Sequence, residues 1–167
     1  MVQQAVSIAP MAMRAEGPGL RLLPDMVVLD LDIASRHDAF CAIGRLAELR
    51  RTVSAAEVVE QLNRREAMSS TALGGGVALP HAQVSRVRSP LALFLRSRRP
   101  VAFDAPDGLP VTDILALIVP RPAMEADFDL LGRLGQWLRR PDRRAALAAC
   151  ERADSICELF YRAARPW

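Results

Sequence analysis

A continuous apolar run near the middle of the chain limits the fold more than any other feature of the sequence. Residues Ile114–Val119 (ILALIV) include no polar residue, and Pro120 and Pro122 follow at once. A strand with one face in water alternates apolar and polar residues, whereas a strand covered on both faces is apolar throughout. The segment from Asp113 to Val119 therefore predicts a central strand of a sheet that is covered on both sides.

The rest of the chain predicts further strands and helices around this one. Short apolar runs predict strands at Met26–Leu31, Val77–Leu79, Leu91–Leu95 and Val101–Phe103. Helical spacing and capping residues predict helices over Ser35–Arg51, from the capping box Ser54–Glu57 to Arg65 or Glu66, over Glu125–Arg139, from Pro141, and from Asp154. On the third helix, one side is lined by Phe128, Leu131, Leu134 and Leu138. Two helices, several strands and three helices predict an α/β domain with one sheet.

Length and composition fit one packed domain. The chain has 167 residues, of which 51% are hydrophobic and 25% charged, which is enough for a core. The first 19 residues, broken by Pro10 and Arg14, predict a flexible tail, so the folded domain is expected over residues 20–167. The cysteines suggest neither a disulfide framework nor a zinc site, and free thiols suit a reducing cytosol; they are Cys41, Cys150 and Cys157.

The basic residues exclude several classes of function. The 22 basic residues are all arginine, which excludes a Schiff-base lysine and a Walker-type phosphate loop. The net charge is only +3 and the arginines alternate with 19 acidic residues, so no nucleic-acid partner is expected. Membrane insertion is not expected either, because the apolar run Ile114–Val119 is far shorter than the roughly 18 residues of a membrane span.

His81 is one of only two histidines and follows a permissive stretch of backbone, LGGGVALPHAQ (Leu73–Gln83). It is either a turn histidine bonded to a nearby carbonyl, or a nucleophile with one nitrogen free and the other N–H held in place. Backbone amides around Gly74, Gly75 and Gly76 could form an anion-binding concavity beside it. A metal site is not expected, since His37 is the only other imidazole.

The segment REAMSSTALGGGVALPHA (Arg65–Ala82) resembles the active-site signature of the mannitol/fructose-type and nitrogen-regulatory IIA proteins of the bacterial phosphotransferase system. The shared pattern is an Arg-Glu pair, a Ser-Thr step, a Gly-rich turn and a hydrophobic-Pro-His ending. The likeness continues through Phe103–Pro120 and Leu130–Leu147 and covers about Leu20 to Tyr161. It implies a mannitol-type IIA-like fold, with a single mixed β-sheet of about five strands flanked by helices on both faces.

The resemblance also implies a chemistry. His81 would accept a phosphoryl group on Nε2 from a small histidine phosphocarrier protein of the HPr or NPr kind, and no cofactor or metal is implied. Arg65 falls where the family places an arginine near the phosphate, although a helix-end arginine paired with a local carboxylate is an alternative. The phosphate-binding residues implied in this way are Arg65, Ser70, Thr71, Gly74, Gly75 and Gly76.

The chain departs from the family at a second active-site position. There the family commonly carries a histidine, on the helix after the last strand. Alignment of LLGRLGQWL puts Asp127 at this position, or Phe128 if the register slips by one. A carboxylate at residue 127 would repel a phosphate, or alternatively would orient His81 by accepting its second N–H.

The sequence allows three alternative functions for the chain. The first is a cytoplasmic IIA-like protein of the nitrogen-regulatory type, phosphorylated on His81, which regulates a protein partner or passes phosphate to a IIB domain. Such a protein is a phosphotransfer component rather than an enzyme that turns over a small molecule. The second is a degenerate, non-catalytic IIA-like binding module, which is favoured by Asp127 in place of the second histidine. The third, a hydrolase with His81 as general base, has no visible nucleophile or acid partner.

Overall fold

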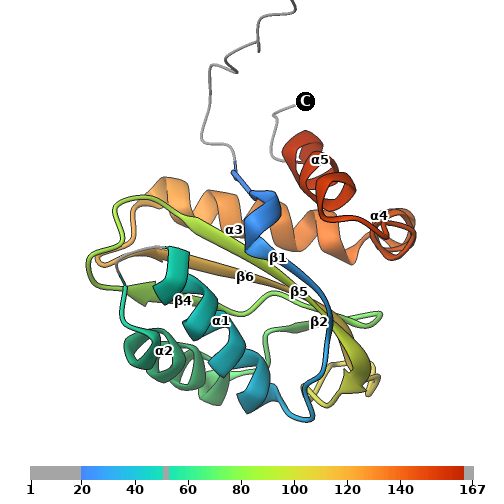
Figure 1. Cartoon of the computed structure of the whole chain (residues 1–167), viewed down its shortest axis with the longest axis horizontal. Coiled ribbons are helices and arrows are strands. Elements are labelled where there is room, and N and C mark those ends of the chain that lie inside the picture. The colour runs from blue at the N-terminus through green and yellow to red at the C-terminus, as the bar shows by residue number, and fades with distance from the viewer. Residues whose placement is uncertain (1–19, 51–52, 164–167) are drawn as a thin grey trace, which may run out of the picture.

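The computed structural model describes residues 20–50 and 53–163 of the chain, apart from the side chains of the last two (Figure 1). The tail predicted over residues 1–19 lies outside the described residues. So does Arg51, the last residue of the first predicted helix. Over the described part of the chain, no helix is long and apolar enough to cross a membrane.

The fold is a single mixed sheet between two layers of helices, as predicted. The strand order is β1-β5-β6-β3-β2, and β4 also pairs with β6. The sheet has six strands rather than about five: β1 (Val27–Leu31), β2 (Ala72–Gly74), β3 (Val77–Ala78), β4 (His81–Val84), β5 (Leu91–Val101) and β6 (Val111–Pro120). The short strands β2 and β4 were not expected. Of the strand predicted at Val101–Phe103, only Val101 lies in a strand, as the last residue of β5.

The apolar run forms the centre of the sheet. Strand β6 pairs antiparallel with β5 on one side and parallel with β3 and β4 on the other. From Ile114 to Ile118 the side chains of β6 are completely buried, as the absence of alternation predicts. The polar residue at the start of the run, Asp113, is buried too, and it accepts two hydrogen bonds from Arg96, at 2.6 and 3.1 Å.

Pro80 interrupts the strand before His81 without ending it. A proline has no N–H to give to a ladder, and β3 stops at Ala78, one residue before the predicted end at Leu79. The carbonyl of Pro80 nevertheless accepts a hydrogen bond from the Leu117 amide at 2.9 Å, which keeps the chain against β6. Pairing therefore resumes at once as β4, and His81 begins a strand instead of lying in a turn.

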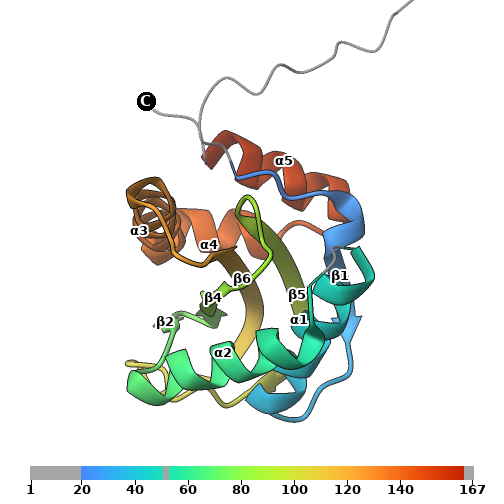
Figure 2. The same ribbon diagram turned by 90° about the vertical axis from the view of Figure 1, so that its left-hand side faces the viewer.

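The helices lie on both faces of the sheet (Figure 1 and Figure 2). One face is covered by α1 (Arg36–Arg50) and α2 (Ala55–Met68), and the other by α3 (Glu125–Arg139), α4 (Pro141–Ala148) and α5 (Ala153–Ala163). A short 3₁₀ turn, Pro24–Met26, precedes β1. The bounds of α3 and the start of α4 at Pro141 agree with the prediction.

Three helix ends differ from expectation. The Ser54 hydroxyl accepts a hydrogen bond from the Glu57 amide, but the Glu57 carboxylate bonds the amide of Ser85, so only half of the predicted capping box forms. Helix α2 continues to Met68, past the predicted end. At the other end of the chain Asp154 lies inside α5 rather than at its cap.

Candidate functional site

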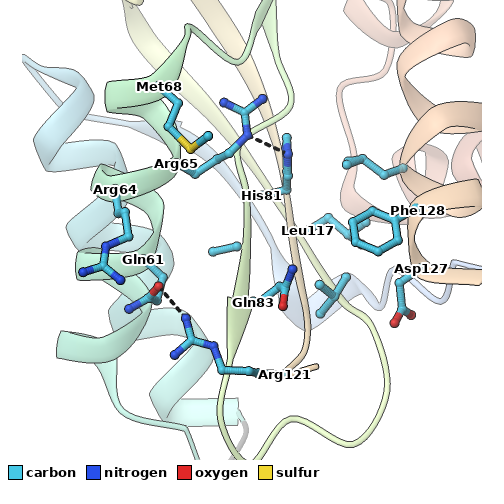
Figure 3. Close-up of a pocket in the computed structure, with 13 residues that line it drawn as sticks. Gln61, Arg64, Arg65, Met68, His81, Gln83, Leu117, Arg121, Asp127 and Phe128 are labelled. Atoms are coloured by element: carbon cyan, nitrogen blue, oxygen red, sulfur yellow. Dashed lines mark hydrogen bonds between the residues drawn. The ribbon is translucent and has the colours of Figure 1, made fainter. Parts of the chain in front are cut away.

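A pocket of about 350 Å³ lies beside β4, between α2 and α3 (Figure 3). Because these helices cover opposite faces of the sheet, the pocket is at an edge where both layers and two strands meet. Its wall combines apolar side chains with three guanidinium groups and two amides. The residues that line it are Gln61, Arg64, Arg65, Met68, His81, Ala82, Gln83, Leu117, Val119, Arg121, Asp127, Phe128 and Leu131.

Strand alternation brings the His81 ring to this pocket. Along β4, His81 and Gln83 are half-buried, while Ala82 and Val84 between and after them are buried. Successive strand residues point to opposite sides, so the two polar residues share one side. The imidazole is thus at the pocket wall and not deep in apolar packing.

Two neighbours fix the proton position on the His81 ring. Arg65 Nε donates a hydrogen bond to His81 Nε2 at 2.9 Å, and Nδ1 lies 3.0 Å from the carbonyl oxygen of Leu79. A guanidinium only donates and a carbonyl only accepts, so the proton is on Nδ1 and the lone pair is on Nε2. Arg65 itself is held by a second hydrogen bond, from Nη1 to the carbonyl of Ser69 at 2.9 Å.

The surroundings keep the His81 ring neutral. Burial lowers the pKa of His81 below its ordinary value of 6.5, and the positive charge of Arg65 lowers it further. The hydrogen bond to the Leu79 carbonyl and the charge of Glu66 raise the pKa, but by less. The resting ring therefore presents a neutral Nε2 lone pair, covered by a half-buried cation.

The lowered pKa gives a direct test. In a His37→Gln background, which leaves one histidine to observe, nuclear magnetic resonance should place the pKa of His81 below 6.5. Since the unfolded ring titrates higher than the folded one, the unfolded state binds more protons between the two values. The contribution of His81 to the free energy of unfolding should therefore be complete above pH 6.5. It should be lost as the pH falls through the pKa of the folded state. A pKa above the ordinary value would contradict this account of the site.

The glycine turn does not contribute to this pocket. Gly74, Gly75 and Gly76 have φ values of +83°, +61° and +78°; Gly74 ends β2, and the other two connect it to β3. Val77 pairs with Asp113 and His81 with Leu117, four residues along β6, which separates the turn from the ring by on the order of 13 Å. The predicted anion-binding role of these glycines thus has no support from their position.

A carboxylate of the chain itself occupies the glycine turn. The Gly75 amide donates a hydrogen bond to Asp107 at 2.7 Å, and this bond is the main reason why the pKa of Asp107 is lowered. A Cβ at Gly75 would also overlap the guanidinium of Arg144. The missing side chain therefore admits an arginine rather than a phosphoryl group.

Alanine substitutions should separate two effects on stability: the backbone strain of a positive φ and the overlap of an added Cβ with Arg144. Gly108 also has positive φ, at +70°, but an added Cβ would meet nothing within 4 Å. Gly108→Ala should thus lower the free energy of unfolding by about 1–2 kcal/mol through backbone strain alone. Gly75→Ala should lower it further, because Arg144 must move as well. Equal losses in urea titrations would show that Arg144 does not pack against the turn.

The two hydroxyl residues implied as phosphate ligands also bond within the protein. Ser70 Oγ donates to the carbonyl of Phe103 and accepts from the amide of Ala72. Thr71 is buried and donates from both its amide and its hydroxyl to Glu66. Neither residue lines the pocket, so their part in the site is indirect.

Asp127 and Phe128 both line the pocket at the start of α3, but their side chains point in different directions. Asp127 Oδ2 accepts a hydrogen bond from the Met124 amide at 2.8 Å and so caps its own helix. Its carboxylate points away from His81, whose Nδ1–H is bonded to Leu79 instead (Figure 3). Phe128, on the apolar side of the helix, is 55% exposed, and its ring points into the pocket.

Sequence reasoning missed three charged residues around His81. Arg64 and Arg121 line the same pocket, and Arg121 donates to Gln61 at 2.8 Å. Glu66 is buried next to Arg65 on α2, close enough to His81 for its charge to raise the pKa of the ring. The only sequence signal for Glu66 was its place in the Arg-Glu pair, and nothing local marked the two arginines. His37, as expected, is exposed on α1 and lies outside the pocket.

The sequence of the chain is similar to those of several known proteins. Residues 22–163 match the family described as phosphoenolpyruvate-dependent sugar phosphotransferase system, EIIA 2. A nitrogen regulatory protein of Bradyrhizobium diazoefficiens is 30% identical over 137 residues, which are 82% of this chain and 90% of that one. A nitrogen regulatory protein of Pseudomonas aeruginosa is 36% identical over 102 residues, which are 61% of this chain and 66% of the relative.

Solved structures show the same fold. The nitrogen regulatory protein IIA-Ntr from Neisseria meningitidis superposes on this chain with a TM-score of 0.79 and 35% sequence identity. The matched region is 84% of this chain and 96% of the Neisseria chain. The IIA mannitol protein of Escherichia coli superposes with a TM-score of 0.68 over 84% of this chain and 99% of its own, at 19% identity.

Proposed function

The chain belongs to the EIIA 2 family of the phosphoenolpyruvate-dependent sugar phosphotransferase system, and from this we propose that it accepts a phosphoryl group on His81 and acts as a regulator. The observation that carries the proposal is the state of the ring: a neutral imidazole with its lone pair on Nε2, between Arg65 and the Leu79 carbonyl. This is the form that a nucleophilic histidine requires.

The transfer is an exchange between two imidazoles. Nε2 of His81 attacks the phosphorus of the carrier's phosphohistidine, the bond from phosphorus to the carrier nitrogen breaks, and its electron pair stays on the carrier ring. Nδ1 keeps its proton, and the Leu79 carbonyl stabilises the positive charge that develops on the His81 ring. The protein contributes position and charge rather than covalent chemistry.

Arg65 changes partner during this transfer. In the resting site its Nε–H covers the Nε2 lone pair, so the guanidinium must leave before phosphorus can approach. Its planar set of donors then suits the phosphoryl oxygens, with Nη1 still near Ser69. Arg64 and Arg121 line the same pocket and make it more favourable for the incoming anion.

The relatives favour regulation as the outcome of phosphorylation. Several proteins that this chain resembles are named nitrogen regulatory protein. We propose a histidine phosphocarrier as the donor, and a regulated protein or a IIB domain as the target, all in the cytoplasm. A IIA mannitol protein with 18% identity to this chain has been solved in complex with a phosphorylated IIB protein, which makes a IIB domain a reasonable second target.

A second candidate function is a binding module that has lost phosphotransfer. Phe128 is the observation that favours it, since a phenyl ring lies in the pocket on the helix where the family commonly has a second histidine. A phenyl ring donates no hydrogen bond to a phosphoryl group.

Reconstituted phosphorylation decides between the two. The full chain is incubated with phosphoenolpyruvate, the first enzyme of the system and a phosphocarrier. The proposal expects one phosphate per chain, stable to base, labile to acid, and located on Nε2 of His81 by ¹⁵N and ³¹P spectra. A chain that stays unphosphorylated while a functional IIA protein is phosphorylated in the same mixture would support the binding module instead.

A further inference from the structure

The proposed transfer leaves one buried charged residue behind the site without a role. Glu66 follows Arg65 on α2, and its side chain is only 4% exposed. Consecutive helix residues point about 100° apart, so Arg65 reaches the pocket while Glu66 reaches the interior. A buried carboxylate is costly unless hydrogen-bonded, and its bonds therefore indicate what it holds in place.

The main partner of Glu66 is Thr71. The Thr71 hydroxyl donates to Glu66 Oε2 at 2.6 Å, and the Thr71 amide is 3.1 Å from both carboxylate oxygens. Arg36 is a weaker partner, because its Nη1 lies 3.5 Å from Glu66 but 2.9 Å from Asp104. The carboxylate thus ties the segment after α2 to the last turn of that helix.

From Thr71 a series of hydrogen bonds leads to Nδ1 of His81. The Thr71 carbonyl accepts from the Leu79 amide at 3.0 Å, and the Leu79 carbonyl in turn accepts from Nδ1 at 3.0 Å. Leu79 is thereby held at both of its backbone groups. A shift of Thr71 would move the carbonyl that fixes the tautomer of the ring.

The same segment also holds the partner of Nε2. Arg65 Nη1 donates to the carbonyl of Ser69, two residues before Thr71. The Glu66–Thr71 bonds therefore fix one end of the short segment on which both ring partners depend. Arg65 acts on Nε2 directly, while Glu66 acts on both nitrogens through Thr71.

We propose that Glu66 is a positioning residue, which fixes the tautomer and orientation of His81 through Thr71, Leu79 and the Ser69–Arg65 bond. The inference rests on the proposed function, because what it positions is the nucleophile of that transfer. It assigns Thr71 a supporting role in place of phosphate binding. Its consequence for the unphosphorylated ring can be observed without any phosphorylation.

Four variants test it, all in the His37→Gln background. Glu66→Gln leaves one acceptor oxygen for two Thr71 donors, and Thr71→Val removes the hydroxyl donor while Thr71→Ser keeps it. Asp113→Asn is the matched control, since it also removes a buried carboxylate but one bonded to Arg96. Ring ¹⁵N shifts report the tautomer and the pKa of His81, and initial rates of phosphorylation report the transfer.

Glu66→Gln should give a mixture of ring tautomers, and a lower pKa of His81, because the lost carboxylate charge favours the protonated ring. Its phosphorylation rate should fall about tenfold or more, since small displacements of a reacting group are costly. Thr71→Val should also mix the ring tautomers and lower the phosphorylation rate, but less, and without the fall in pKa that comes from the lost charge. Thr71→Ser and Asp113→Asn should match the parent chain.

The inference would be overturned if Glu66→Gln kept the tautomer and the phosphorylation rate of the parent chain. It would also be overturned if Thr71→Val and Thr71→Ser behaved alike. If Glu66→Gln does not fold, the comparison of Thr71→Val with Thr71→Ser provides the test, because both variants keep the Glu66 carboxylate and the backbone amide of residue 71. A parent chain that is not phosphorylated would overturn the proposed function alone, because the ¹⁵N measurement would still show whether Glu66 controls the ring.

Discussion

His81→Ala should take up no phosphate from the phosphorylated carrier, whereas His37→Ala should be phosphorylated like the parent chain. Position 81 supplies the only imidazole in the pocket, and the remaining lining residues have no nucleophile that would give an acid-labile, base-stable phosphate. Phosphate incorporation from labelled phosphoenolpyruvate, followed by acid and base treatment, measures the difference. This is the largest effect expected of any substitution here.

His81→Asn separates loss of the nucleophile from loss of structure. Alanine leaves the buried Leu79 carbonyl without its partner, which costs about 1–3 kcal/mol of folding free energy. The asparagine amide can still donate near the position of Nδ1–H, so this variant should be more stable than His81→Ala and equally unphosphorylated. Phosphate that persists in either folded variant would place the acceptor elsewhere and remove the basis of the proposed function.

The elements that could be predicted are those whose own residues determine them. Helix α3 has apolar residues at helical spacing and lies between Pro122 and Pro141, and its observed bounds agree with the prediction. Strand β4 was missed because HAQV is short, half polar and preceded by proline. It forms because β6 provides a partner, which is a tertiary effect that a local pattern does not contain.

The residues of the site also divide into those that the sequence predicted and those that depend on tertiary contacts. The likeness to known signatures identified His81 and Arg65, and the end of α2 and the start of β4 bring them to hydrogen-bond distance across 16 positions of sequence. Glycines indicate a permissive backbone but not the partner of each amide, so Asp107 at the Gly75 amide was unforeseen. Glu66 escaped notice because its function depends on contacts with a segment five residues away.

The choice between Asp127 and Phe128 was open for a geometric reason. Neighbouring helix residues differ in direction by about 100°, so an alignment uncertain by one residue is uncertain about the surroundings of the side chain. In the structure both residues line the pocket, but the Phe128 ring points into it, whereas the Asp127 carboxylate caps α3. Position 128 is therefore the one at which to restore a second imidazole.

Phe128→His should raise the initial rate of phosphorylation, on the order of 10- to 100-fold, because a preorganised donor at a charged transition state is worth at least that much. The new imidazole would enter the pocket from the first turn of α3, whose positive end favours its neutral, N–H-donating form. Asp127→His should give no such gain, and it should destabilise the chain by about 1 kcal/mol through loss of the Met124 cap.

Phe128→Leu is the matched control, since it shortens the side chain without adding a donor. If it increases the rate as much as Phe128→His, then the phenyl ring obstructs the carrier and the missing hydrogen bond is irrelevant. If only the histidine variant gains, the natural chain is a slow phosphoacceptor limited at residue 128. If neither gains while the parent chain is phosphorylated at a rate typical of its family, Phe128 does not limit the transfer, and the Arg65, Arg64 and Arg121 guanidinium groups are sufficient for it.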